Sequence, residues 1–66
     1  MFDKKYQRAM NIIEQEIEFV DYLYRTHMDL AKLCKDDLRK IEFDIAQKYL
    51  ATWEELTYLK RKIEGP

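Results

Sequence analysis

Apolar residues recur at alternating spacings of three and four along most of this chain, which is the period of an α-helix with one apolar side. No glycine or proline occurs before Gly65, and no alternating pattern typical of a strand is present. The sequence therefore predicts an all-α protein, with residues 1–66 forming a single small helical domain. His27 is the one interruption of the apolar series, which comprises Tyr6, Met10, Ile13, Ile17, Val20, Tyr24, Ala31, Cys34, Leu38, Ile41 and Ile45.

Helix breaks have to be inferred from capping residues, because glycine is absent from the interior. Thr52 followed by Glu55 matches a capping box, in which the threonine hydroxyl and the glutamate carboxylate bind each other's backbone amides. This motif predicts a helix from about residue 53 to 63, ended by Gly65 and Pro66. Further candidate breaks are Asp36 with Asp37, and, with a weaker capping pattern, Thr26.

Two architectures follow from these candidate breaks, and a third follows if none of them is real. The favoured one has a long first helix to about Leu33 and two shorter helices folding back along it, as a small antiparallel three-helix bundle or a helical hairpin. A break at Thr26 instead gives three helices of roughly 23, 22 and 12 residues, still antiparallel because the connections are short. An uninterrupted helix would form a two-stranded coiled coil nearly 100 Å long at 1.5 Å per residue. The capping motif at Thr52 disfavours that third arrangement.

The first helix carries more apolar surface than one neighbour covers. A second ridge lies roughly 80° to 120° from the main series, whereas packing against a single helix needs a stripe about 100° wide. Glu16 lies between the two ridges, where a carboxylate is either paired at the rim or fixes register between chains. The second neighbour is an internal helix in a bundle, or a partner molecule in a hairpin. The second ridge comprises Ile12, Phe19, Leu23 and Leu30.

Chain length also favours self-association. A domain of 66 residues rarely derives more than roughly 3 to 5 kcal/mol from its core alone. The single cysteine cannot form an internal disulfide. His27 and Cys34 lie roughly 10 Å apart along a helix, too far to share a zinc ion. We expect no metal site and no cofactor, with His27 hydrogen-bonded at the core edge and Cys34 an apolar filler.

Charge and chemistry narrow the function further. Twelve basic and thirteen acidic side chains leave a net charge of -1, so the strong positive field of a nucleic-acid binder is missing. No secretory signal or membrane-spanning stretch is found, which predicts a cytoplasmic protein without membrane contact. Phosphate-binding glycines and a nucleophile with an adjacent base are also missing, so we expect neither an enzyme nor a small-molecule substrate. The preference for Ile, Lys and Tyr suggests an AT-rich bacterial or phage genome.

The leading prediction is a small non-enzymatic helical module for protein–protein interaction or regulation, acting as an adaptor, inhibitor or accessory subunit. Its partner is another protein, a second copy of the chain, or both. Large apolar and aromatic side chains outside the main series are the favoured anchors of such interfaces. The candidate partner-binding residues are Ile12, Glu16, Phe19, Tyr22, Leu23, Phe43, Leu50 and Tyr58.

Two alternatives stay open. One is a nucleic-acid-associated regulator in which residues 36–63 form a helix-turn-helix-like pair, although the acidic balance and the missing glycine turn speak against it. The other is a purely structural helical oligomer whose assembly completes the core. For the first alternative, the candidate nucleic-acid contacts are Lys32, Lys35, Arg39, Lys60, Arg61 and Lys62.

Overall fold

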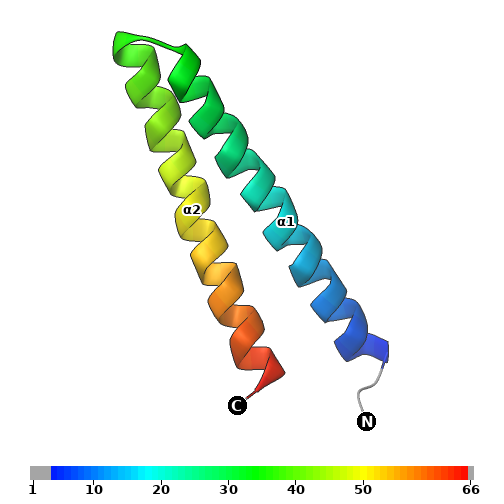
Figure 1. The fold of residues 1–66 in the computed structure, drawn as a ribbon. Helices are drawn as coiled ribbons and strands as arrows, with labels where there is room; N and C mark the ends of the chain where they lie inside the picture. Colours follow the sequence, from blue (N-terminus) through cyan, green and yellow to red (C-terminus); the bar gives the residue numbers. More distant parts are fainter. Residues whose placement is uncertain (1–3, 66) are drawn as a thin grey trace.

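The computed structural model describes residues 4–65, and these form two helices, α1 (Lys4–Leu33) and α2 (Asp36–Glu64), with no strand among them. The helices lie side by side and antiparallel, so that both ends of the chain are at the same end of the molecule (Figure 1). The all-α prediction is confirmed. Residues 1–3 and Pro66 lie outside the described range, and with them part of the predicted stop after α2. Gly65 does end α2, with φ 86° and its N–H donating to Arg61 O.

The expected three-helix bundle is wrong, because α2 continues through Thr52 without a break. The Thr52 hydroxyl donates to Lys48 O, one turn earlier, at 3.1 Å. A threonine whose hydroxyl binds the i−4 carbonyl satisfies itself inside the helix and caps nothing. The break considered at Thr26 is also wrong, since α1 runs through that position. The capping motifs were therefore compatible with a helix interior as well as with a helix start.

The break near Asp36 is confirmed, and it is made without glycine. Only Cys34 and Lys35 separate the two helices. Lys35 is extended, with φ −128° and ψ 157°, and Asp36 has a positive φ of 55°. Aspartate is one of the few side chains that enters the left-handed region at modest cost. The aspartate at this position explains how such a short connection reverses the chain.

Arg39 holds the end of α1 from the first turn of α2. Its Nε–H lies 3.2 Å from Ala31 O and 3.1 Å from Cys34 O, two carbonyls at the C-terminal end of α1. The last carbonyls of a helix have no partner within the helix, and a cation near them also complements the helix dipole. Arg39 therefore supplies the cap that glycine provides at many other helix ends.

Replacing Arg39 by alanine is expected to lower the free energy of unfolding by about 1 kcal/mol, the usual net value of a hydrogen bond, since the side chain is largely exposed. Urea unfolding monitored by circular dichroism measures this change. Lys40→Ala is the matched control, because it removes a neighbouring positive charge without touching these carbonyls. Equal effects of the two substitutions would show that charge, and not the cap, is what matters at Arg39.

The contact between the helices contains little buried surface. Within residues 4–65 only Met10, Val20, Ala31 and Ala46 are buried, and no large side chain is fully buried. Ala46 is 0% exposed, which indicates that the helices approach closely around its methyl group. The Cα trace extends 53 × 18 × 12 Å, the dimensions of a single layer of two helices. A single layer leaves both of its broad sides open, whereas protein domains are normally built from two or more packed layers.

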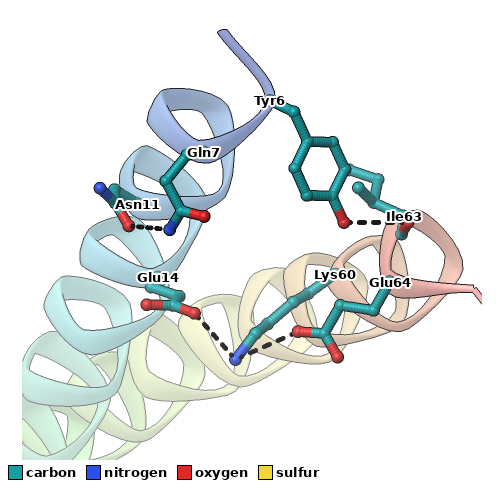
Figure 2. A network of polar contacts seen from close by, with 7 residues as sticks. All are labelled: Tyr6, Gln7, Asn11, Glu14, Lys60, Ile63 and Glu64. Carbon is teal, nitrogen blue, oxygen red and sulfur yellow. Dashed lines mark hydrogen bonds and ion pairs between the residues drawn. The ribbon is translucent and has the colours of Figure 1, made fainter. Parts of the chain in front are cut away.

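Polar contacts join the helices near the chain ends (Figure 2). The Tyr6 hydroxyl donates to Ile63 O at 3.3 Å. Lys60 Nζ lies 3.4 Å from Glu14 Oε1 on the other helix and 3.7 Å from Glu64 Oε1 on its own. These contacts hold together the end of the hairpin farthest from the turn.

Candidate functional site

One broad side of the hairpin carries most of its exposed large apolar side chains, and we call it the apolar face. Phe19 on α1 is 56% exposed and Leu38 on α2 is 63% exposed, values far above those of core residues. Leu23 and Ile45 are half-buried and border the exposed members. The apolar face comprises Ile12, Phe19, Leu23, Leu30 and Leu33 from α1 and Leu38, Ile41, Ile45, Leu59 and Ile63 from α2.

Helical geometry places these two stripes on the same side of the layer. On each helix, the stripe lies roughly 100° around the axis from the residues that face the other helix. The rotation from the facing residues to the stripe runs backward, which is opposite to the direction in which successive residues turn around the axis. The two helices are right-handed, antiparallel and face each other, so equal backward displacements bring both stripes to the same broad side. The apolar face is thus two helices wide.

The opposite side carries a mixture of charged and apolar side chains. Two open grooves lie there, each lined by residues of both helices that are displaced in the forward sense. One joins Asp21 and Tyr24 to Leu50 and Trp53. The other lies near the turn and is lined by Met28, Ala31, Lys32, Asp36, Arg39, Lys40 and Phe43. No member of the apolar face lines either groove.

The structure gathers four of the candidate partner-binding residues and separates the other four from them. Ile12, Phe19 and Leu23 lie together on the apolar face, with Glu16 exposed among them in the single hairpin. The other candidates are Tyr22, Phe43, Leu50 and Tyr58.

Those four candidates belong to other surfaces. Phe43 and Leu50 line the two grooves on the side opposite the apolar face. Tyr22 and Tyr58 are exposed toward the outer edges of their helices, and Lys62 Nζ lies 5.3 Å from the Tyr58 ring centroid. Phe43 and Leu50 therefore lie on a different side of the hairpin from the second ridge of the first helix.

The α2 half of the apolar face was not predicted from the sequence. Leu38, Ile41 and Ile45 continue the series predicted to face the core, yet Leu38 and Ile41 are exposed. The short turn at residues 34–35 restarts the helix in a different rotational position, and α2 instead directs Glu42, Ala46 and Tyr49 toward α1. The periodicity of Leu38, Ile41 and Ile45 continues the series of the first helix, so the sequence did not reveal that the turn changes the direction of these side chains.

A polar cluster lies between the helices beside the apolar face. His27 Nδ1 is 2.5 Å from Glu42 Oε2, and the two side chains are only 21% and 23% exposed. Because a carboxylate only accepts hydrogen bonds, the Nδ1–H of the ring donates. The His27 ring also stacks on Tyr49, with centroids 5.5 Å apart and planes 23° apart. The prediction that His27 is hydrogen-bonded at the core edge agrees with this arrangement.

The candidate nucleic-acid contacts form two groups at opposite ends of the hairpin. Arg39 binds backbone carbonyls, and Lys32 Nζ lies 3.9 Å from Asp29 Oδ1. Lys60 is shared between Glu14 and Glu64. The structure therefore divides these cations between the turn and the chain ends and places carboxylates beside several of them. The members of the two groups are Lys32, Lys35 and Arg39, and Lys60, Arg61 and Lys62.

Among the residues that the structure describes, no group of three or more His, Cys, Asp and Glu side chains is arranged to hold a metal ion. Neither α1 nor α2 is both long and apolar enough to cross a membrane. Cys34 is half-buried and free at the turn.

Comparison with known proteins found no matching family model, no matching curated protein and no matching solved structure.

Proposed function

We propose that this chain is a small protein-binding module that contacts its partner through the apolar face. The observation that carries the proposal is the concentration of exposed large apolar side chains on one broad side of the hairpin. Contiguous apolar surface of this kind is uncommon on soluble monomers and typical of interaction sites. An adaptor, an inhibitor and an accessory subunit would all use such a surface in the same way.

The shape of the face also favours a helical partner. The α1 members of the face, from Ile12 to Leu33, lie on a four-three series whose two remaining positions are Glu16 and Thr26, and Leu38, Ile41 and Ile45 on α2 repeat the same spacing. Side chains at this spacing form the knobs and holes by which helices interdigitate. A helix or a pair of helices is therefore the complementary surface.

A pair of charge substitutions tests the proposal. The face variant carries Phe19→Glu and Ile41→Glu, and the control variant carries Tyr22→Glu and Phe43→Glu, which alter comparably exposed apolar residues elsewhere. Each chain is immobilised and exposed to an extract of the native host, and bound proteins are quantified by mass spectrometry. We expect proteins held by the unaltered chain to be lost from the face variant and retained by the control, because glutamates cannot be desolvated without a partner.

Retention of the same proteins by the face variant, or their equal loss from both variants, would contradict the proposal. Circular dichroism of each variant establishes that the helices are intact before binding is compared.

The nucleic-acid alternative has weaker support. A helix-turn-helix-like pair needs a turn within residues 36–63, whereas α2 is continuous there. A duplex binder that relies on Lys60, Arg61 and Lys62 would lose affinity steeply with added salt. Duplex and single-stranded binding at low salt, measured by fluorescence anisotropy, distinguishes this alternative from the apolar-face proposal.

A further inference from the structure

We propose that the occupant of the apolar face is a second copy of this chain, and that two hairpins stack face to face as an antiparallel four-helix bundle with both turns at the same end. The inference rests on the proposed function, since it takes the apolar face to be a binding surface and names its partner.

The first argument is that each helix carries two apolar stripes, or seams, one facing the other helix and one on the apolar face. In a four-helix bundle every helix packs against two neighbours, so it needs two apolar seams roughly a quarter-turn apart. On α1, one seam includes Met10, Val20 and Ala31 and faces α2. The second seam is the α1 part of the apolar face. An isolated hairpin has no use for the second seam, whereas a bundle uses both.

On α2 the same division is present. Ala46 faces α1 and is wholly buried, while Leu38, Ile41 and Leu59 form the exposed seam beside it. Two copies of the face therefore present equivalent helix pairs to each other, as a symmetric interface requires.

The second argument is the size of the face and the weakness of the isolated core. A copy laid over one broad side of the hairpin, 53 × 18 Å between Cα atoms, would have a footprint of roughly 950 Å², comparable to the about 800 Å² buried per partner in a standard stable interface. Within residues 4–65 the hairpin alone fully buries no large side chain. Stacking a second layer encloses the apolar side chains between two pairs of helices, which is how short helical chains obtain a core.

The distribution of polar groups along the face selects the arrangement. Six of its ten members lie in the half nearest the turn: Leu23, Leu30, Leu33, Leu38, Ile41 and Ile45. The other half is interrupted by Glu16 and Thr52. With the turns at the same end, α1 of one copy lies over α2 of the other, and Leu30 and Leu33 meet Leu38 and Ile41. Turns at opposite ends would place the turn-half leucines over the half that contains Glu16, where desolvation of a carboxylate is costly.

Sedimentation equilibrium of the purified chain from micromolar to millimolar concentration tests the assembly. We expect a species of twice the 8.2 kDa chain mass, with a melting temperature that rises with concentration. The face variant, Phe19→Glu with Ile41→Glu, should sediment as a monomer at concentrations where the control, Tyr22→Glu with Phe43→Glu, remains dimeric. A monomer at all concentrations, or a trimer, would overturn the inference.

The arrangement is tested separately with spin labels near the turn. The variant Cys34→Ala with Lys35→Cys carries one label per chain and leaves the apolar face unaltered. Turns at the same end place the labels about 10 to 25 Å apart, a few interaxial distances of 8–10 Å. Turns at opposite ends place them about 45 Å apart, one helix length at 1.5 Å per residue. The longer distance would overturn the proposed arrangement.

The two proposals fail in different ways. A monomeric chain whose capture of host proteins still depends on Phe19 and Ile41 would leave the apolar face as a binding site and remove the second copy as its occupant. A monomeric chain that captures nothing through this face would remove both.

Discussion

Replacing Ala46 by glutamate is expected to unfold the hairpin at room temperature. Ala46 is 0% exposed at the point where α1 and α2 approach each other, so a longer side chain forces the helices apart and a carboxylate there is desolvated without a partner. Leaving a buried charge uncompensated costs roughly 3 to 5 kcal/mol, which equals the whole stability expected of so small a core. The measurement is far-UV circular dichroism, with nearly complete loss of helical signal.

Ala51→Glu is the matched control for this experiment. It makes the same substitution in the same helix, five residues later, at an exposed position. Its helical signal should match that of the unaltered chain, because alanine and glutamate both favour helices. A folded Ala46→Glu variant would show that the helices do not approach closely at this residue.

The contact between His27 and Glu42 is expected to be the strongest polar coupling between the helices. Both side chains are mostly buried, so removing one leaves the other with an unsatisfied polar group, at about 1 to 3 kcal/mol. A double-mutant cycle of His27→Ala and Glu42→Ala, followed by urea unfolding at fixed protein concentration, should give a coupling energy of at least about 1 kcal/mol. Each substitution should lower the free energy of unfolding by less in a chain that already carries the other substitution than in the unaltered chain.

Asp21 and Arg25 provide the comparison. Their ion pair, with Arg25 Nε 3.2 Å from Asp21 Oδ2, is exposed and lies within one helix. Its coupling should be below about 0.5 kcal/mol, because water screens exposed pairs and their side-chain entropy opposes them. Equal coupling in the two cycles would mean that partial burial between the helices adds nothing to the contact of His27 with Glu42.

The features of this protein that follow from local helix geometry could be predicted from its sequence. The three-four periodicity identified a helical protein, and the width of the apolar sector around Ile12 and Phe19 indicated that the first helix has more to bury than one neighbour offers. Both features depend only on the 100° advance per residue, which is a local property of the backbone. The same local reasoning could not decide where a helix stops, because Thr52 is as well satisfied within a helix as at its start.

The sequence by itself determined the helical class, the absence of an internal disulfide and the surplus apolar surface of the first helix. Only the tertiary structure decided that the chain reverses once, at Cys34 and Lys35, and that Leu38 and Ile41 then join the first helix's second ridge instead of the core. The physical reason is that the backbone angles of the turn, with Asp36 at positive φ, set the rotation of α2 about its axis. That rotation is also held by contacts between the two helices, such as His27 with Glu42 and Arg39 with Ala31 O, which periodicity along one helix does not contain.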